Sequence, residues 1–385
     1  MDNIQMRDLK GQYAKIQQEI DEAVLRVMRG GQYINGPEVG MFAEALQDYT
    51  GAKHVIPCAN GTDALQIALM ALGLKAGDEV IVPAFSYISP AETVELLGLT
   101  PVIVDVDPDS FNLTAKNIEK SISATTKAII VVHLFGQSCD MSPIMDFARK
   151  IHLSVIEDNA QSLGVYYTLP PTPLYRGLDE RKQTGTMGHV GCTSFFPTKN
   201  LGCYGDGGAM MTNDDDLAQK LKMIANHGQR QKYHHEMLGC NSRLDTLQAA
   251  ILNVKLKYLN DSATAHRRVA KIYTEGLKDV PGIVTPKEEP FSTHVYHQYT
   301  LKVGGGKRDA LQQYLAEQGI PTTVYYPLPL QEQPAFRYTV RVAGPLTVAK
   351  ELSRSVLSLP MHVDLTEEQQ RYIIEKICTF LTKQP

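Results

Sequence analysis

The sequence has 385 residues, which is long enough for a large domain and a smaller one. Hydrophobic residues make up 43% and charged residues 21%, as in ordinary globular proteins, and a formal net charge of -4 gives no reason to expect nucleic acid as a partner. No apolar run reaches the roughly 18 to 20 residues of a membrane span, no signal-peptide core follows Met1, and the six cysteines form no CxxC pair. We expect a cytoplasmic protein with reduced thiols, no bound metal and no membrane contact.

Short strands alternate with helical segments over the first two thirds of the chain. A strand at 54–58 is followed by helical spacing from Thr62 to Leu74. Further apolar, β-branched runs occupy residues 79–82, 101–105, 127–132, 153–156 and 208–212. Strands that are apolar on both faces are typical of a parallel sheet covered by helices, so we expect an α/β fold.

The last third of the chain changes to an α+β pattern. Its expected elements are a linking helix at 244–277, a strand at 294–303, a helix at 308–317 and a final helix after Thr366, where Gln369 completes a capping box. We therefore expect a large domain of residues 1–255 and a small domain of residues 256–385.

Residues 165–190 form a proline-rich and then polar stretch between two expected strands. Loops of this length in compact domains are usually functional or disordered. The apolar and aromatic residues around its prolines favour a packed flap over a disordered loop.

Lys199 is the strongest candidate for chemistry. It follows a short apolar stretch and precedes a loop rich in glycine, in the run SFFPTKNLGCYGDGG. Glycines let the backbone turn sharply and approach a ligand closely. A lysine held in this way can lose its proton and attack a carbonyl to form a Schiff base. Taken alone, the run more often describes a surface lysine beside a turn, because lysine is mostly a solvated surface residue.

Three segments at the ends of expected strands could serve the same chemistry. Gly61 opens a helix whose N-terminal N–H groups could bind a phosphate, although a plain capped turn has the same sequence. Asp158 could pair with a protonated pyridine nitrogen or simply cap a helix. Tyr87 could stack on a flat cofactor ring, or only fill the core.

A histidine pair precedes the expected linking helix. His234 and His235 are adjacent, so their side chains diverge, and no third ligand lies at metal spacing. A metal site is therefore disfavoured. Arg243, further along the same segment, suits a carboxylate or a phosphate, or a surface ion pair.

Together these segments resemble the DegT/DnrJ/EryC1/StrS sugar aminotransferases. The matching motifs, in order, are ANGTDALQIAL, PAFSY, IEDNAQSLG, TSFFPTKNLGCYGDGGAM and GCNSRLDTLQAAI. The resemblance runs from Gly36 to His362. It implies the α/β fold of PLP-dependent transferases of fold type I (aspartate aminotransferase-like), with a mainly parallel seven-stranded sheet and a smaller α+β C-terminal domain. It also implies pyridoxal 5'-phosphate (PLP) as cofactor and a homodimer with shared active sites.

The resemblance further implies a role for each site residue. Lys199 would hold PLP covalently and then move a proton at the sugar carbon, and Asp158 would keep the ring nitrogen protonated. The other contacts would be Gln161 at the ring hydroxyl, Tyr87 on the ring face, Gly61, Thr62 and Ser194 at the phosphate, Asn241 at the phosphate in the neighbouring subunit, Arg243 at a substrate carboxylate, and Tyr325 and Tyr326 beside the substrate.

A closer resemblance is to bacterial members that aminate UDP-2-acetamido-2-deoxy-3-oxo-glucuronate for O-antigen. We therefore expect transfer of an amino group from L-glutamate to such a nucleotide sugar, in lipopolysaccharide or other surface polysaccharide biosynthesis. Those relatives have a histidine near the position of Tyr325 and a shorter segment at 165–190, and many sugar aminotransferases have histidine or asparagine at the position of Gln331.

Several alternatives stay open at this point. One is amination of a dTDP-3-keto or UDP-4-keto deoxysugar. Another is a dehydratase on the same fold, which Lys199 disfavours because such relatives carry histidine there. The third is a regulatory protein that keeps the fold without turnover.

Overall fold

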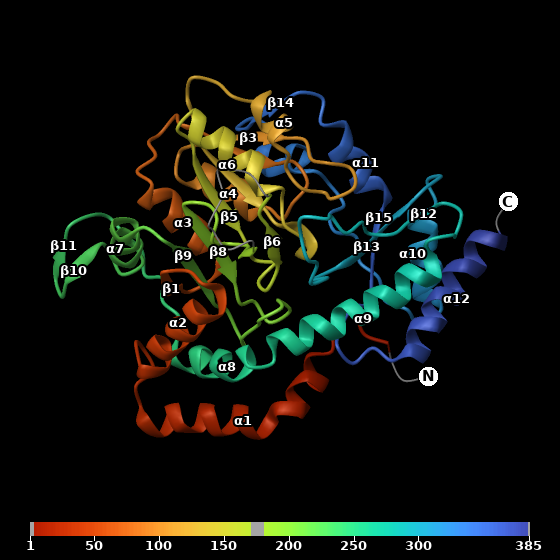
Figure 1. The fold of residues 1–385 in the computed structure, drawn as a ribbon, viewed down its shortest axis with the longest axis horizontal. Coiled ribbons are helices and arrows are strands. Elements are labelled where there is room, and N and C mark those ends of the chain that lie inside the picture. The colour runs from red at the N-terminus through yellow and green to blue at the C-terminus, as the bar shows by residue number, and fades with distance from the viewer. Residues whose placement is uncertain (1–3, 171–180, 384–385) are drawn as a thin grey trace.

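The computed structural model describes residues 4–170 and 181–383, and a sheet covered by helices forms its centre (Figure 1). The sheet has eight strands in the order β1-β9-β8-β5-β4-β2-β3-β14. Within this sheet β9 runs opposite to the other seven strands, which share one direction. The strands are β1 (His54–Cys58), β2 (Glu79–Pro83), β3 (Thr100–Val104), β4 (Thr126–Val132), β5 (Ser154–Asp158), β8 (Val190–Ser194), β9 (Gly208–Thr212) and β14 (Arg341–Ala343).

The central strands are buried on both faces, as their continuous apolar runs predict. Every residue of β2 is buried, and Ile129, Ile130 and Val131 of β4 are fully inaccessible. The α/β prediction with a mainly parallel sheet is therefore confirmed. The helices of this part of the chain are α1 (Leu9–Gly30), α2 (Pro37–Thr50), α3 (Gly61–Ala71), α4 (Ser89–Leu96), α5 (Ala115–Glu119), α6 (Met141–Lys150) and α7 (Asp215–Ile224).

The sheet has one strand more than the seven that the resemblance implies. The added strand is β14, which comes from the last third of the chain and pairs in parallel with β3. Its Arg341 forms an ion pair with Glu79 of β2, with 2.7 Å between Nε and Oε1. A strand of three residues in a polar stretch leaves too weak a pattern to predict. Residues 341–343 thus join the large sheet, and the boundary at residue 255 stays a prediction.

A second core forms around a small antiparallel sheet near the C-terminus. Its three strands have the order β12-β13-β15. The final helix begins with the predicted capping box: Gln369 N donates to Thr366 Oγ1 at 3.2 Å, and Thr366 N donates to Gln369 Oε1 at 3.0 Å. The α-helices and strands after residue 256, apart from β14, are α9 (Leu259–Leu277), β12 (Ile283–Val284), β13 (Tyr299–Val303), α10 (Arg308–Glu317), α11 (Thr347–Ser355), β15 (Val356–Leu359) and α12 (Glu367–Lys383), and of these α11 packs on the core of the large sheet.

Two predicted elements differ in extent from the observed ones. The stretch at 244–277 is two helices, α8 (Thr246–Leu256) and α9, because Tyr258 leaves the helical region with φ -101° and ψ 2°. The strand predicted at 294–303 begins only at Tyr299, since Tyr296 has a φ of 48° and cannot continue an extended strand.

The segment at 165–190 starts and ends as a β-ribbon. Its strands β6 (Tyr166–Thr168) and β7 (Arg181–Gln183) pair antiparallel. Tyr167 is buried and donates from its hydroxyl to Asp140 Oδ1 at 2.6 Å, which fixes the base of the ribbon. The rest of the predicted flap, residues 171–180, lies outside the described residues.

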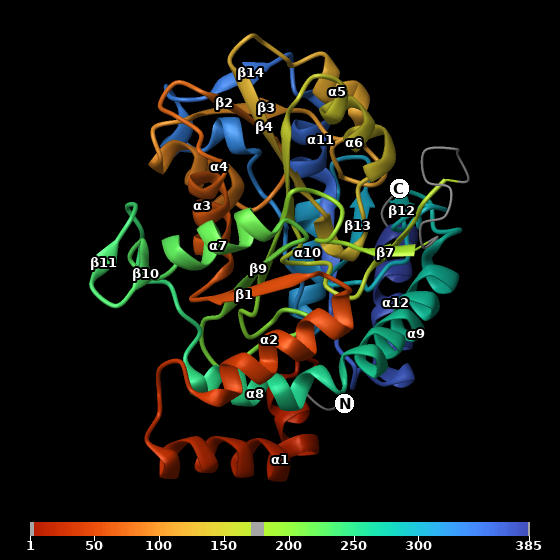
Figure 2. The same ribbon diagram turned by 60° about the vertical axis from the view of Figure 1, so that its left-hand side comes forward.

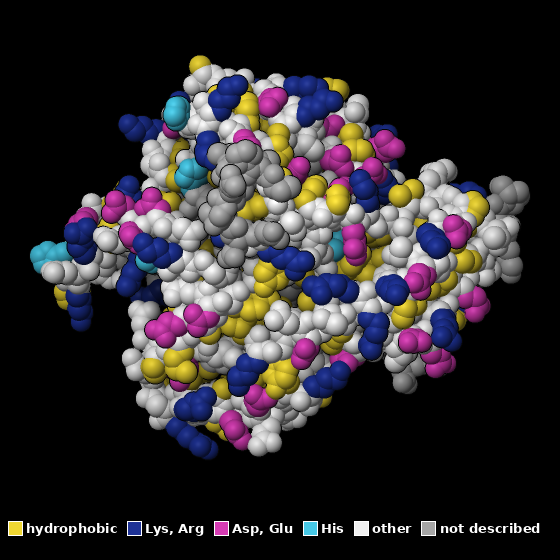
Figure 3. All heavy atoms as spheres, in the orientation of Figure 1, with side chains coloured by type: hydrophobic (Ala, Val, Ile, Leu, Met, Phe, Trp, Pro, Cys, Tyr) yellow, Lys and Arg dark blue, Asp and Glu magenta, His cyan; other side chains and the backbone are white. Residues whose placement is uncertain are grey.

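The surface carries two further features. A hairpin of β10 (Gln229–Gln231) and β11 (His234–His235) projects from the body, and α1 lies along the outside of α8 (Figure 2). Side chains of both charge signs are mixed over the face shown in Figure 3. None of the helices in the described part of the chain is long and apolar enough to cross a membrane.

Candidate active site

A cavity of about 500 Å³ lies at the carboxyl ends of the parallel strands. This edge is where open α/β sheets bind their ligands. Residues that end or closely follow β2, β4, β5 and β8 line this cavity. Its walls contain all but two of the predicted site residues: Gly61, Thr62, Tyr87, Asp158, Gln161, Ser194, Lys199, Tyr325 and Tyr326.

Lys199 lies in a tight turn that its glycines permit. The Lys199 N–H donates to Phe196 O at 2.8 Å, and a Cβ on Gly202 would lie 2.4 Å from Pro197 O. Burial lowers the pKa of Lys199 to about 8, although the nearby Asp158 carboxylate raises it, and Arg7 lowers it further. The amine donates no hydrogen bond to any described residue, so it is free to react in the cavity.

Asp158 is the last residue of β5 and faces the same cavity. Its Oδ1 accepts a hydrogen bond from Ala160 N at 3.0 Å, and no donor among the described residues reaches its other oxygen. Burial raises the pKa of Asp158, against the lowering effects of Ala160 N and Lys199. A buried carboxylate with spare acceptor capacity suits a cationic group of a ligand.

Glu157 precedes Asp158 but points to the other face of the sheet. It is fully buried and accepts from His133 Nε2 at 2.8 Å, Gly185 N at 2.8 Å and Gly188 N at 2.5 Å. Burial alone would raise the pKa of Glu157, but the hydrogen bonds from His133, Gly188 and Gly185 bring it below its ordinary value. His133 Nδ1 accepts from Cys139 N at 3.0 Å, so the proton of this imidazole lies on Nε2.

The start of α3 forms a cradle for an anion. Asn60 caps the helix by accepting from Asp63 N at 2.8 Å, which leaves the N–H groups of Gly61 and Thr62 without partners among the described residues. A Cβ on Gly61 would lie 2.7 Å from Ser194 Cβ, so only glycine fits there. Free N–H groups at a helix N-terminus, with hydroxyls beside them, suit a phosphate. Sequence analysis missed Ser89, whose hydroxyl lies 2.8 Å from that of Thr62.

Aromatic side chains form one wall of the cavity. Tyr87 is 58% exposed, and its ring centroid lies 6.5 Å from that of Tyr326. Gln161 Nε2 donates to the Tyr326 hydroxyl at 3.1 Å, while Gln161 Oε1 accepts from Phe135 N at 2.8 Å. Gln161 and Tyr326 are thus held in fixed positions, whereas the exposed Tyr87 ring is open to a flat ligand.

Asn241 and Arg243 do not line the cavity of their own chain. Asn241 is exposed and forms an isolated β-bridge with Asn226, and Arg243 is half-buried. Between them, Ser242 Oγ accepts from Ala59 N at 3.1 Å and ties this segment to the anion cradle. The implied roles of Asn241 and Arg243 in a neighbouring subunit stay predictions.

Sequence analysis missed His297, which lines the cavity beside Lys199. His297 is buried, its Nδ1 lies 3.1 Å from Asn200 Oδ1, and Arg7 donates to its carbonyl oxygen. Burial holds the pKa of His297 well below its usual value, so the imidazole is neutral. No local motif marks this residue, because it reaches the cavity from far along the chain.

A lysine and a carboxylate facing one cavity at this edge of an α/β sheet are the pair of groups that a PLP-dependent enzyme requires. The chain belongs to the DegT/DnrJ/EryC1/StrS aminotransferase family, whose sequence model matches residues 14–378. It is therefore an aminotransferase of the nucleotide-sugar class.

Three known proteins illustrate the relationship. The chain is 47% identical over 379 residues to UDP-2-acetamido-2-deoxy-3-oxo-D-glucuronate aminotransferase of Pseudomonas aeruginosa, covering 98% of this chain and 99% of that one. It is 45% identical over 380 residues to a pleiotropic regulatory protein of Geobacillus stearothermophilus, covering 98% of both. The crystal structure of NtdA from Bacillus subtilis with bound cofactor PMP matches with a TM-score of 0.85 and 31% identity, covering 96% of this chain and 82% of that one.

The cofactor of this family is PLP, and the cavity fits it. The anion cradle at Gly61, Thr62 and Ser194 offers donors to a phosphate, and Asp158 offers an acceptor to a protonated ring nitrogen. The free amine of Lys199 lies in the same cavity.

Proposed function

We propose that this enzyme transfers the amino group of L-glutamate to the 3-keto group of a UDP-2-acetamido-2-deoxy-hexuronate, for lipopolysaccharide O-antigen or another surface polysaccharide. The observation that carries the proposal is the free Lys199 amine facing Asp158 in one cavity. The 47% identity to the Pseudomonas aeruginosa enzyme supports the choice of sugar.

Each wall of the cavity has a separate task in this proposal. Lys199 holds the cofactor through its amine, and Asp158 stabilises the positive charge on the ring nitrogen. The cofactor contacts are completed by Gly61, Thr62 and Ser194 at the phosphate, Gln161 at the ring hydroxyl and Tyr87 on the ring face. PLP, when bound, supplies the electron sink that lets a proton leave the carbon bearing the amine.

Lys199 also moves the proton. Because burial lowers the pKa of this amine to about 8, the group can take up and release a proton near neutral pH. Asp158 faces the same cavity, and its negative charge favours the protonated amine. These opposing effects keep both protonation states of Lys199 accessible during turnover.

The proposal includes a homodimer with shared active sites. Asn241 and Arg243 precede α8 and lie outside the cavity of their own chain. In a homodimer Asn241 would contact the phosphate of the second copy's cofactor, and Arg243 would bind the substrate carboxylate there. An arginine is the residue best suited to a carboxylate, because its planar group donates two parallel hydrogen bonds.

Tyr325 and Tyr326 border the sugar in this proposal. Both line the cavity, and Tyr326 is held by Gln161. A tyrosine hydroxyl carries no positive charge, so Tyr325 is a weaker partner for a uronate carboxylate than a protonated histidine would be. The alternative substrates are therefore a dTDP-3-keto or a UDP-4-keto deoxysugar, which lack that carboxylate.

The test follows the two halves of the reaction. The PLP-loaded enzyme is mixed with L-glutamate, and 2-oxoglutarate is measured in amounts stoichiometric with active sites. The three keto sugars are then compared by the rate at which each yields an amino sugar. Fastest amination of the UDP-3-keto-hexuronate supports the proposal, and a faster deoxysugar reassigns the substrate.

A second candidate is a regulatory role without turnover. The relative named a pleiotropic regulatory protein, at 45% identity, favours it. A protein that binds PLP but forms no 2-oxoglutarate from L-glutamate, and no amino sugar, would support this candidate and contradict the enzymatic proposal.

A further inference from the structure

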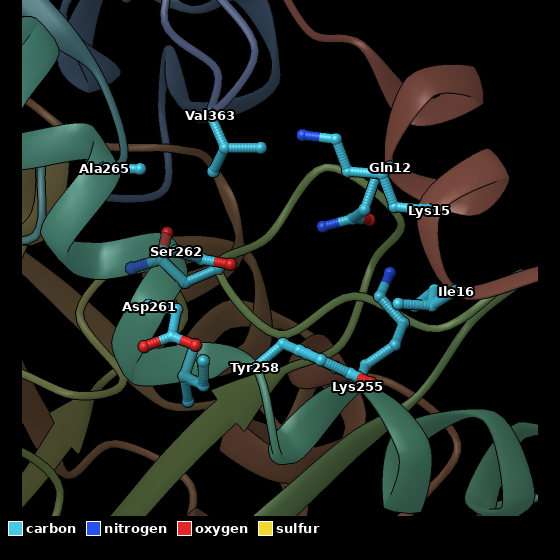
Figure 4. Close-up of a pocket in the computed structure, with 11 residues that line it drawn as sticks. Gln12, Lys15, Ile16, Lys255, Tyr258, Asp261, Ser262, Ala265 and Val363 are labelled. Carbon is cyan, nitrogen blue, oxygen red and sulfur yellow. The ribbon is translucent and has the colours of Figure 1, made fainter. Parts of the chain in front are cut away.

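A second cavity, of about 330 Å³, lies between α1, the junction of α8 with α9, and the loop before α12. Volumes of this size hold small organic ligands. Figure 4 shows the Lys255 side chain rising from α8 with its amine directed into this space, toward Gln12 and Ile16 of α1. Asn200, the residue after Lys199, also lines this second cavity, so the second cavity adjoins the active-site turn.

Lys255 is the unusual group in this cavity. Its side chain is buried, with 4% of the residue exposed, and its Nζ has no hydrogen-bond partner among the described residues. The amine lies 5.0 Å from the centroid of the Tyr204 ring, its one described aromatic contact. Buried polar groups are nearly always paired, so a buried amine aimed into a cavity, with no partner among the described residues, suits an anionic ligand.

The other residues that line the cavity indicate the chemical character of the rest of the ligand. Gln12, Asn200 and Ser262 offer neutral hydrogen-bonding groups. Ile16, Leu259, Ala265 and Val363 are apolar. Free inorganic phosphate would leave these apolar walls uncovered, whereas a short hydrocarbon body would fill the space against them.

The carboxylates nearby do not neutralise Lys255. Lys15 is in ion contact with Asp364, and Glu19 accepts from Lys257 Nζ at 3.1 Å and from the Tyr258 hydroxyl. Asp261 is exposed at the rim of the cavity. The charged and titratable groups in the surroundings of the amine include Tyr13, Lys15 and Glu19 on α1, Lys257 and Tyr258 at the α8–α9 junction, Asp261 on α9, Cys203 and Tyr204 after the active-site turn, and Asp364.

We propose that this cavity is a binding site for a small aliphatic carboxylate, with the carboxylate group on Lys255 and the hydrocarbon body against Ile16, Leu259 and Val363. Helical geometry is interrupted on two sides of this cavity: α1 leaves it at Ile16, with φ -122° and ψ 18°, and α8 ends at Leu256, ahead of the non-helical Tyr258. The site is separate from the cofactor cavity and does not depend on the proposed sugar substrate.

The site has a characteristic pH dependence. Burial lowers the pKa of Lys255 to about 8, and only the protonated amine attracts an anion. Binding of a carboxylate to Lys255 should therefore be strongest below about pH 8 and should weaken progressively as the pH rises above that value. A carboxylate held by surface lysines would bind equally at pH 7 and pH 9, because their pKa lies near 10.4.

The experiment measures binding of sodium pentanoate to the PLP-loaded full-length enzyme by saturation-transfer NMR at pH 7 and pH 9. Pentanoate is expected to bind at pH 7 and to weaken at pH 9. Lys255→Met should weaken binding at pH 7 by about tenfold or more, because a charge-assisted hydrogen bond is lost. Lys257→Met is the matched control, since Lys257 is exposed and lies outside the cavity, and it should change nothing.

A second variant keeps the test decisive if Lys255→Met folds poorly. Ala265→Leu fills the cavity from α9 without touching the amine and should also abolish pentanoate binding. Inorganic phosphate should displace pentanoate only at much higher concentration. Wild-type protein that does not bind pentanoate, binding that survives both variants, or phosphate that competes equally well would overturn the proposal.

Discussion

The end of β5 places two adjacent carboxylates on opposite faces of the sheet, and they have opposite environments. Glu157 is surrounded by donors from His133 and the backbone of residues 185–188, and its pKa is lowered. Asp158 accepts one hydrogen bond within the described chain, and burial raises its pKa.

This difference indicates that Glu157 stabilises the fold, whereas Asp158 is available to bind a ligand. The hydrogen bonds to Glu157 tie the turn at 185–188 to β5 and so set the entry of β8, which leads to Lys199. Asp158 lacks such partners because its side chain lies on the face of the sheet that borders the cavity. Substitutions on the two faces should therefore change different properties of the enzyme.

Lys199→Ala should produce the largest effect on the cavity face. Without the amine, the enzyme loses both its covalent hold on PLP and its proton carrier, so the amination rate should fall by about a thousandfold or more. The measurement is formation of 2-oxoglutarate from L-glutamate in a single turnover. A wild-type rate in this variant would contradict the proposed role of Lys199.

Asp158→Asn should lower the amination rate by about a hundredfold, because the neutral amide no longer stabilises a protonated ring nitrogen. The melting temperature should stay the same or rise, since the raised pKa of Asp158 means that its charged form is destabilising in the folded protein. The rate is measured on the PLP-loaded enzyme and the melting temperature on the cofactor-free enzyme, because bound PLP would add its contact with Asp158 to the stability. A large loss of stability would place Asp158 with Glu157 as a structural group.

Glu157→Gln is the matched variant on the other face and should lower stability by about 2–4 kcal/mol, because its amide N–H₂ would face backbone donors in a buried site. The check is urea unfolding as a function of pH. The lowered pKa means that the stability due to Glu157 is fully present above the unfolded pKa of about 4.3 and is lost as the pH falls through the folded value. The difference between wild type and variant should therefore begin to shrink below about pH 4.3 and continue to shrink as the pH falls further, and a difference that does not change with falling pH would contradict this account.

Among the four substitutions, Gly61→Ala should have the smallest effect. Its Cβ would lie 2.7 Å from Ser194 Cβ, so the start of α3 must shift, at a cost of about 1–3 kcal/mol. The shift moves N–H groups of the anion cradle, and the affinity of the apoenzyme for PLP should fall about tenfold. Titration of apoenzyme with PLP measures this, and unchanged affinity would show that the cradle does not bind the phosphate.

The sequence predicts the sheet and most of the cavity for a common reason. The apolar strands leave a strong local pattern, and the residues that follow them meet at one edge of a parallel sheet by topology alone, as Asp158 and Tyr87 do. β14 and His297 could not be predicted, because each depends on contacts with distant segments. The role of Glu157 needed only the alternation of side chains along a strand, since adjacent residues face opposite sides.

The most direct test of the central claim is borohydride reduction of the PLP-loaded enzyme, followed by peptide mass spectrometry. Lys199 and Lys255 both have a pKa lowered to about 8, so a lowered pKa alone does not select between them. The account predicts the reduced cofactor on Lys199 alone. Cofactor on Lys255, or on neither lysine, would contradict it.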